Sequence, residues 1–207
     1  ANTVNTTIAA ISGVMRTAFN MGIIGSDDYM RVKLIKRVTN HKMPVGRELK
    51  QHEIKKMLAC CKRDKDTLGV RDAAVIAVML STGLRRSEIV GLNIEDYDSK
   101  NMLLIVNHGK GNRQRLAHIS VSAKKLLQKW LKQRSDKTGT LFTRVIADDQ
   151  TEHRLSAQAI YNLIRLRYEK EGIEHCAPNE LRRTLVTRLL DTGVDINTVR
   201  EIVGHKK

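Results

Sequence analysis

The chain has 207 residues, of which 41% are hydrophobic and 29% are charged, enough for one medium-sized domain or for one domain with part of another. Its longest apolar run, residues 73–80, is too short to cross a bilayer, and no N-terminal secretory signal is visible. These features argue against a membrane-bound or secreted class and predict a soluble, helix-rich, cytoplasmic protein.

The charge is strongly unbalanced, with 37 Lys and Arg against 22 Asp and Glu and a formal net charge of +15. Such an excess indicates a polyanionic partner, and DNA is the first candidate, although ribosomal and membrane-surface proteins share this charge. Aromatic residues make up only 3% of the chain, too few for a surface that stacks unpaired bases. We therefore expect double-stranded DNA as the partner, and a nucleoid-associated protein.

The metal-ligating residues lack the usual spacings. Cys60, Cys61 and Cys176 form neither a disulfide pattern nor a zinc pattern, which indicates reduced thiols. His52 has no second histidine one turn later, where Lys56 stands. We expect no metal site.

The N-terminal region is expected to be a small helical piece. Apolar residues recur at helical spacing over residues 6–21, and a short helix should follow Ser26. Residues 31–42 are basic and poorly periodic, and we interpret them as a linker that either lies along a DNA backbone or is a solvated tether. The expected division separates residues 1–45 from a main domain in residues 46–207.

The main domain is predicted to be mainly α with a small antiparallel β-sheet, an α+β fold. Strands at 102–106 and 114–121 should flank a turn at 107–112. The helix expected at about residues 70–81 is apolar nearly all round and should therefore be buried. Helices are expected at about 47–62, 70–81, 87–92, 122–134, 156–171, 181–192 and 196–203.

Two arginine motifs carry the chemistry. Arg85 ends the run Ser81-Thr82-Gly83-Leu84-Arg85, with Glu88 shortly after it, and Arg182 follows Glu180-Leu181. Arginine grips a phosphate with two parallel hydrogen bonds, and phosphodiester chemistry needs fixed positive charge at the non-bridging oxygens. Two such arginines, each near an acidic residue, predict a clamp on one phosphodiester.

Lys110 stands between Gly109 and Gly111 at the expected hairpin turn, close to Arg113 and Arg115. A glycine-flanked tip can bring an ammonium group close to a DNA groove. The segment is not a phosphate-binding P-loop, because it lacks the spaced upstream glycine and the following Ser or Thr.

These motifs, in this order and together with Gly204-His205 near the end of the sequence, resemble the catalytic domain of the tyrosine recombinases, or phage integrase family. The resemblance covers about residues 46–207, and residues 1–35 look like the last helices of the family's core-binding domain. It implies site-specific cutting of one DNA strand through a covalent 3′-phosphotyrosine, followed by rejoining to a partner strand. It further implies a dimer to tetramer on DNA, and no metal or nucleotide cofactor.

The resemblance also assigns roles to individual residues. Arg85 and Arg182 map onto the two catalytic arginines, and Lys110 onto the general acid toward the departing 5′ oxygen. His205 maps onto a hydrogen-bond donor to the scissile phosphate, and Glu88 onto the acidic residue that orients the first arginine. DNA contacts are expected from Arg86, Arg113, Arg115 and Arg183.

Two features depart from the family pattern. Asn179 falls where the family most often has histidine, and it can donate a hydrogen bond to phosphate or simply serve as the N-cap of the following helix. The family's nucleophilic tyrosine lies past the residue that His205 matches, and none of the tyrosines fits that position. The sequence is therefore expected to be a catalytic fragment truncated before its tyrosine and inactive for cleavage.

Two other interpretations remain at this stage. Residues 189–200 have a two-helix pattern with Gly193 at the turn, which suits a helix-turn-helix regulator. A recombinase relative that binds DNA without catalysis would also fit Asn179. The regulator leaves Arg85, Lys110 and Arg182 as scattered charges.

Overall fold

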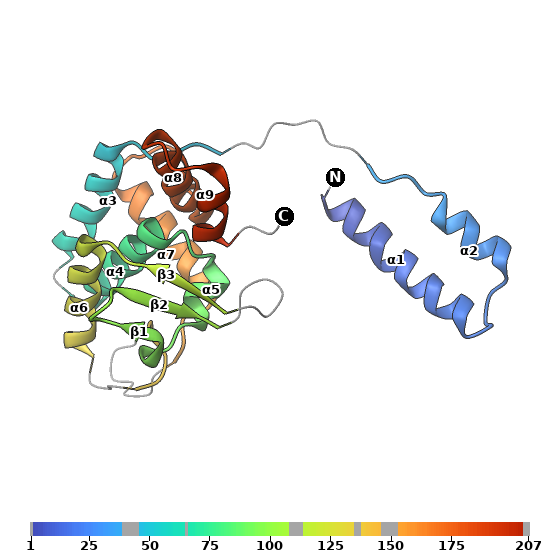
Figure 1. The fold of residues 1–207 in the computed structure, drawn as a ribbon, viewed down its shortest axis with the longest axis horizontal. Helices are drawn as coiled ribbons and strands as arrows, with labels where there is room; N and C mark the ends of the chain where they lie inside the picture. Colours follow the sequence, from blue (N-terminus) through green and yellow to red (C-terminus); the bar gives the residue numbers. More distant parts are fainter. Residues whose placement is uncertain are drawn as a thin grey trace. The chain divides into compact units, whose positions relative to one another are not determined.

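The computed structural model describes residues 2–38, 46–64, 66–107, 114–134, 138–145 and 153–204. Its internal contacts divide the chain into two units, residues 1–45 and residues 46–207 (Figure 1). The assignment of the first unit to a core-binding domain stays a prediction.

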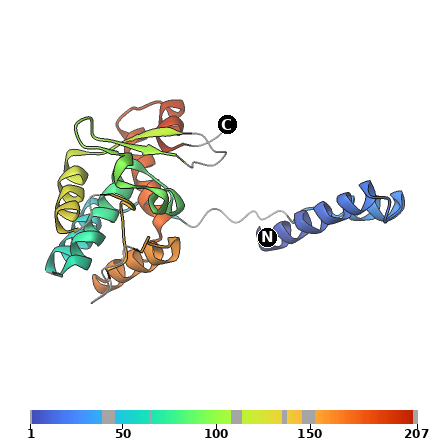
Figure 2. The ribbon, with the colours of Figure 1, turned by 90° about the horizontal axis from the view of Figure 1, so that it is seen from below.

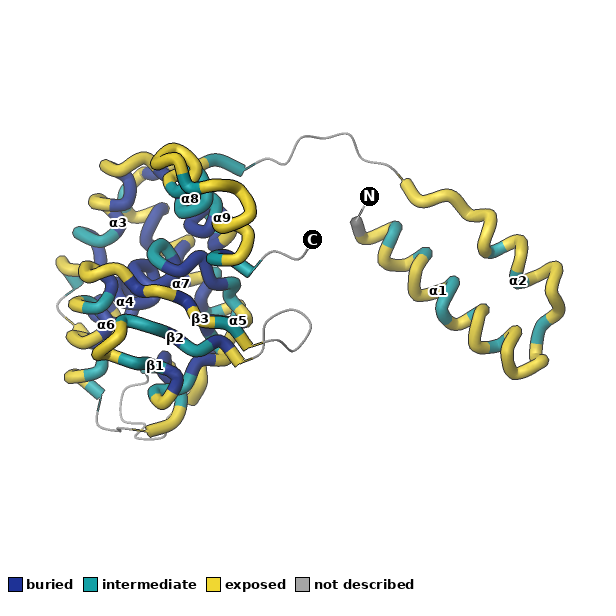
Figure 3. The backbone as a smooth tube through the Cα atoms, viewed as in Figure 1, coloured by how far each residue is buried: buried dark blue, intermediate teal, exposed yellow. Residues whose placement is uncertain are grey.

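The first unit is a pair of helices. α1 (Asn2–Asn20) ends just before Gly22, whose φ of 71° turns the chain toward α2 (Ser26–Lys33). The rings of Phe19 and Tyr29 stack with their centroids 5.0 Å apart. None of the described residues of this unit is buried, so this part of the chain has no core of its own (Figure 3).

The second unit is built around α4 (Thr67–Thr82). Its alanine, valine, isoleucine and methionine residues leave no polar face, and every residue from Gly69 to Met79 is buried. The Asp66 side chain caps the helix by accepting a hydrogen bond from the Gly69 amide. The helices packed against α4 are α3 (Gln51–Arg63), α6 (Val121–Gln133), α7 (Ala157–Lys170) and α8 (Pro178–Asp191).

A small antiparallel sheet follows α4 through α5 (Arg86–Gly91) and the short 3₁₀ helix η1 (Ile94–Asp96). Leu104 pairs with Ala117 across the two longer strands, and both side chains are buried. The hairpin of these strands runs alongside the C-terminal helices (Figure 2), where Arg115 Nη1 donates to the Ile202 carbonyl at 3.0 Å. In the described residues the sheet order is β1 (Tyr97–Asp98), β2 (Leu103–Val106), β3 (Arg115–His118).

The last helix, α9 (Ile196–Val203), packs on α8 and ends at Gly204. Gly193 and Gly204 have φ values of 83° and 68°, so the chain turns sharply at each, and Gly193 stands at the break between two helices that the sequence predicts.

The predicted α+β class is confirmed, with differences in detail. α3 begins at Gln51 rather than at residue 47, and α4 begins at Thr67 rather than at residue 70. β1 and η1 were not predicted, and the strands of the hairpin are shorter than expected. α8 begins at Pro178 rather than at residue 181, because the fixed φ of proline suits the first turn of a helix. The N-cap is therefore Ala177, and the interpretation of Asn179 as a possible N-cap was wrong.

Other sequence expectations concern the whole chain. Cys60, Cys61 and Cys176 are free and buried. In the ranges that the structure describes, no helix is long and apolar enough to cross a membrane.

Candidate active site

A tight turn at the end of α4 places the first arginine. Gly83 caps the helix in the left-handed conformation, with φ 62° and ψ 21°. A Cβ atom here would lie 3.1 Å from Leu185 and 3.2 Å from Val203, so the glycine lets the turn pack directly against the C-terminal helices. Arg85 then stands at the N-cap of α5.

Glu88 holds Arg85 at two points. Glu88 Oε2 accepts a hydrogen bond from the Arg85 backbone amide at 2.7 Å, and Oε1 accepts one from Arg85 Nη1 at 3.0 Å. Arg85 Nη2 also donates to the Gly204 carbonyl at 3.3 Å. The Glu88 side chain is 2% exposed and that of Arg85 is 32% exposed, so a buried carboxylate fixes a guanidinium that still reaches the surface.

Arg182 reaches the same place from α8. Its Nη1 donates to the Gly83 carbonyl at 2.5 Å, whereas its buried Nη2 has no hydrogen-bond partner among the described residues. Burial and the nearby positive charge of Arg85 lower the pKa of Arg182 to about 10, which still leaves it protonated at neutral pH. A buried cationic donor without a partner is costly, and an anion bound next to it would remove that cost.

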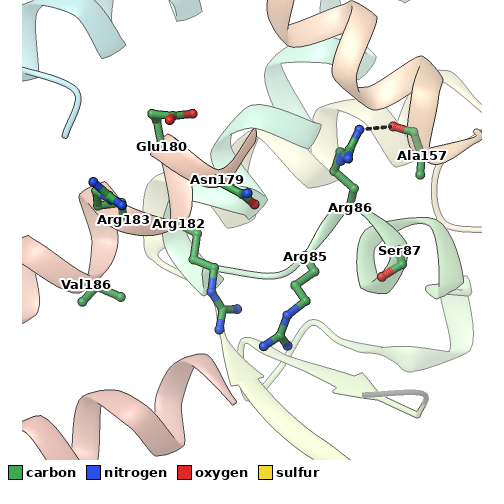
Figure 4. Close-up of a pocket in the computed structure, with 9 residues that line it drawn as sticks. All are labelled: Arg85, Arg86, Ser87, Ala157, Asn179, Glu180, Arg182, Arg183 and Val186. Carbon is green, nitrogen blue, oxygen red and sulfur yellow. Dashed lines mark hydrogen bonds between the residues drawn. The ribbon is translucent and has the colours of Figure 1, made fainter. Parts of the chain in front are cut away.

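The two arginines line one cleft with a volume of about 660 Å³. Figure 4 shows their guanidinium groups reaching toward the same region from separate elements. The predicted clamp of Arg85 and Arg182 thus has both members in one place. The cleft is lined by Arg85, Arg86, Ser87, Ala157, Asn179, Glu180, Arg182, Arg183 and Val186.

Arg86 and Arg183 lie at the margins of the cleft and have protein partners. Arg86 Nη1 donates to the Ala157 carbonyl at 3.5 Å, and its guanidinium carbon lies 5.7 Å from the centre of the Tyr161 ring. Arg183 Nη1 donates to the Gly46 carbonyl. In Figure 4 both side chains turn away from the Arg85–Arg182 pair, and their roles in DNA binding stay predictions.

Asn179 lines the cleft from the first turn of α8. The neighbouring Glu180 also lines the cleft, but its carboxylate accepts a hydrogen bond from the Ala177 backbone amide at 2.7 Å and so caps the start of α8. Asn179 therefore brings a side-chain amide to the cleft. The amide can donate a hydrogen bond to a ligand, but it can neither carry charge nor take up a proton as a base.

The base of the predicted lysine hairpin is held by side chains. The Asn107 amide donates to Asp96 Oδ1 at 2.5 Å, and the Gln114 amide donates to Asn107 Oδ1 at 2.8 Å. Lys110 and Arg113 themselves lie outside the described residues, as does His205. Their predicted roles are untested.

Arg115, predicted as a DNA contact, is instead paired with Glu88 and largely buried. Arg115 Nη2 donates to Glu88 Oε2 at 3.1 Å, and its side chain is only 16% exposed. Strand alternation was the signal that could have shown this, because Arg115 and the apolar Ala117 face the same side of β3. The backbone carbonyls of Gly83 and Gly204, which also hold the arginines, leave no such signal in a sequence.

Among the residues that the structure describes, no group of three or more His, Cys, Asp and Glu side chains is placed to hold a metal ion.

Comparison with known proteins identifies the family. The model of the phage integrase family matches residues 47–207, and the chain belongs to this family. The tyrosine recombinase XerA of Pyrococcus furiosus is 30% identical over 171 residues, which cover 82% of this chain and 57% of XerA. The chain thus spans little more than half the length of this relative.

Solved structures share the fold. The Tn1549 transposon integrase in complex with circular intermediate DNA has a TM-score of 0.71 at 20% identity, covering 100% of this chain and 72% of the integrase. The lambda integrase tetramer bound to a Holliday junction has a TM-score of 0.69 at 16% identity, covering 100% of this chain and 57% of that one. Both likenesses concern the fold alone.

Proposed function

We propose that this chain supplies the phosphate-binding part of a tyrosine-type site-specific DNA recombinase. The observation that carries the proposal is the meeting of Arg85 and Arg182 in one cleft, with Arg182 Nη2 left without a hydrogen-bond partner among the described residues. Membership of the phage integrase family gives the arrangement its chemical context.

The residues would act on one phosphodiester. The tyrosine hydroxyl releases its proton to solvent as its oxygen attacks phosphorus and forms a 3′-phosphotyrosine, while the bond from phosphorus to the 5′ oxygen breaks and that oxygen takes a proton from Lys110. Arg85 and Arg182 stabilise the charge that grows on the non-bridging oxygens, and Asn179 and His205 donate hydrogen bonds to them. Attack by the 5′ hydroxyl of a partner strand reverses the step and rejoins the DNA.

The nucleophile is assigned to a tyrosine that follows His205 in the complete protein. Tyr29 stacks within the first unit, and Tyr168 is buried. Neither Tyr97 nor Tyr161 is among the residues that line the cleft. None of the four tyrosines of this chain therefore lines the cleft of Arg85 and Arg182 where the nucleophile would have to act.

The proposed partner is double-stranded DNA in the cytoplasm, in a nucleoid-associated complex. The basic excess of the chain supports this, because phosphate contacts dominate affinity for DNA. A dimer to tetramer on DNA is proposed by analogy with the lambda integrase tetramer on a Holliday junction.

The test is covalent capture of DNA by the complete protein. Labelled genomic DNA from the source organism is incubated with it, and potassium dodecyl sulfate precipitation recovers only DNA joined to protein. We expect recovered DNA with free 5′ hydroxyl ends, a loss of about 10²- to 10³-fold in Arg85→Ala, and no loss in Arg165→Ala. Arg165 is a matched control because it is exposed on α7 and pairs with Glu169.

A protein that binds the DNA but never becomes covalently attached would contradict the proposal. That result would favour a DNA-binding relative without catalysis or the helix-turn-helix regulator, which the family match does not favour.

A further inference from the structure

Arg115 lies at the junction of three parts of the active-site region. It is the first residue of β3 and lies on the same strand face as Ala117, which is buried in the core. Its Nη2 donates to Glu88 in α5, and its Nη1 donates to the carbonyl of Ile202 near the end of α9. One guanidinium thus connects the hairpin, the segment that carries Arg85 and the last helix.

The connections close into a ring. Glu88 binds both Arg115 and Arg85, and Arg85 Nη2 donates to the Gly204 carbonyl, two residues after the carbonyl that Arg115 binds. Gly204 itself packs against the Arg115 side chain, because a Cβ atom there would lie 2.6 Å from Arg115 Nε. The turn at Gly204 is therefore held from both sides, by Arg85 and by Arg115.

The ring also sets the local charge. With Arg85 alone, the Glu88 carboxylate would cancel the guanidinium that faces the cleft. With Arg115 on its second oxygen, the group of three keeps one net positive charge, and Arg85 remains attractive to an anion. The shared carboxylate fixes the position of Arg85 without neutralising the site.

We propose that Arg115 is a positioning residue for strand cleavage, which aims Arg85 and fixes the turn before His205, and that it is not a DNA contact. The proposal rests on the proposed function. Both Nη atoms of Arg115 are bound to protein and its side chain is 16% exposed, whereas a DNA contact would need them free. This replaces the role expected from the sequence.

The test compares Arg115→Ala, Arg115→Lys and the control Arg165→Ala in the complete protein by covalent DNA capture. We expect the rate at saturating DNA to fall about 10- to 100-fold in Arg115→Ala, because a small displacement of a catalytic group is enough for such a loss. The DNA concentration that gives half the maximal rate should stay within about twofold of that of the unmodified protein, and the salt dependence of DNA binding should be unchanged. Arg115→Lys, which keeps the charge but cannot reach both acceptors, should recover only part of the rate, and added guanidinium ion should partly rescue Arg115→Ala.

An unchanged rate in both variants would overturn the proposal. So would a normal rate at saturating DNA with a salt slope reduced by about 1, which is the signature of a lost phosphate contact. If Arg115→Ala does not fold, Arg115→Lys decides between these results.

A second measurement separates this proposal from the proposed function. In residues 1–207 without DNA, we expect Arg115→Lys to shift the Arg85 Nε–Hε NMR signal and to speed hydrogen exchange of the Gly204 amide, with no change at either in Arg165→Ala. Absence of covalent DNA in the unmodified protein would contradict the proposed function alone. Undisturbed Arg85 and Gly204 signals would contradict the positioning role alone.

Discussion

Two groups of buried and half-buried charges in the second unit differ in how their arginines are paired with carboxylates. The core cluster, Asp64, Arg71, Asp72 and Arg167, ties α4 to α7 and to the residue after α3. The Arg167 side chain is 2% exposed, with Nε and Nη2 on Asp72 Oδ2 at 2.9 and 2.6 Å, and Nη1 on Asp64. Arg71 occupies the other oxygen of Asp72 at 2.7 Å. Both arginines are paired with carboxylates, and the half-exposed Lys170 adds a third cation 3.6 Å from Asp64 Oδ2.

The cleft cluster is Arg85, Glu88, Arg115 and Arg182, in which Arg85 and Arg115 are paired with the one carboxylate and Arg182 lies close enough to be affected by their charges. Burial alone would lower the pKa of Arg167, but its hydrogen bonds to Asp64 and Asp72 raise it above its ordinary value. Burial lowers the pKa of Arg182, and within the described ranges no carboxylate is hydrogen-bonded to it to reverse the shift. The core cluster, whose arginines are paired with carboxylates, therefore stabilises the fold, whereas the cleft cluster, in which the buried Arg182 Nη2 has no partner among the described residues, is suited to receive an anion.

The largest expected effect comes from Arg182→Ala. Covalent DNA capture should fall about 10³-fold, because a donor to the transition state is lost. The free energy of unfolding should change by no more than about 1 kcal/mol, since the lost side chain was an incompletely paired buried charge. Urea unfolding of the same preparation checks the second part, and a large destabilisation would contradict the contrast between the clusters.

Arg167→Ala should show the opposite pattern. Its removal leaves buried carboxylates short of a partner, so we expect the free energy of unfolding to fall by about 3 kcal/mol. Below the unfolding transition, the rate of covalent capture per folded molecule should match that of the unmodified protein. A selective loss of rate in a stably folded Arg167→Ala would show that the core cluster also serves catalysis.

Glu88→Gln tests whether positive charge alone is sufficient. The substitution makes the cleft more positive but weakens the hold on both arginines. We expect DNA binding to be equal or tighter, with a rate of covalent capture about 10²-fold lower because Arg85 is misplaced. Fluorescence anisotropy and capture, measured at one salt concentration, check the two parts, and an undiminished rate would refute a positioning role for Glu88.

The smallest effect concerns the buried thiols, of which Cys60 and Cys61 lie near the core cluster. Burial raises the pKa of Cys61 and of Cys176 to about 12, so at about pH 8 both stay protonated and should react slowly with iodoacetamide. Cys60 Sγ lies 3.9 Å from Arg167 Nη1. Loss of Arg167 removes a charge that favours the Cys61 thiolate, so faster labelling can come only from more frequent opening of the destabilised core. Mass spectrometry should show faster labelling of Cys60 and Cys61 in Arg167→Ala and slow labelling in Arg182→Ala. Equal acceleration in both variants would contradict the contrast between the clusters.

The sequence was informative where a position requires one residue type, such as glycine at a turn with positive φ or arginine for binding a phosphate. Gly83 and Gly204 stand where the backbone turns with positive φ, and the arginines of two motifs far apart in the sequence line one cleft. The two-residue strand β1 was too short to show alternation, and it exists because Leu104 offers a partner to Tyr97. Arg167 and Asp72 carry no local signal of their pairing, because folding alone brings α7 to α4.

The central claim, that the cleft cluster is an anion site, is tested most directly by titrating inorganic phosphate into residues 1–207 and following the arginine Nε–Hε NMR signals. We predict saturable shifts of Arg85 and Arg182, with Arg71 and Arg167 unmoved because their donors are already bound to Asp64 and Asp72. An Arg182 signal that does not move, or uniform small shifts of all exposed arginines without saturation, would contradict the account.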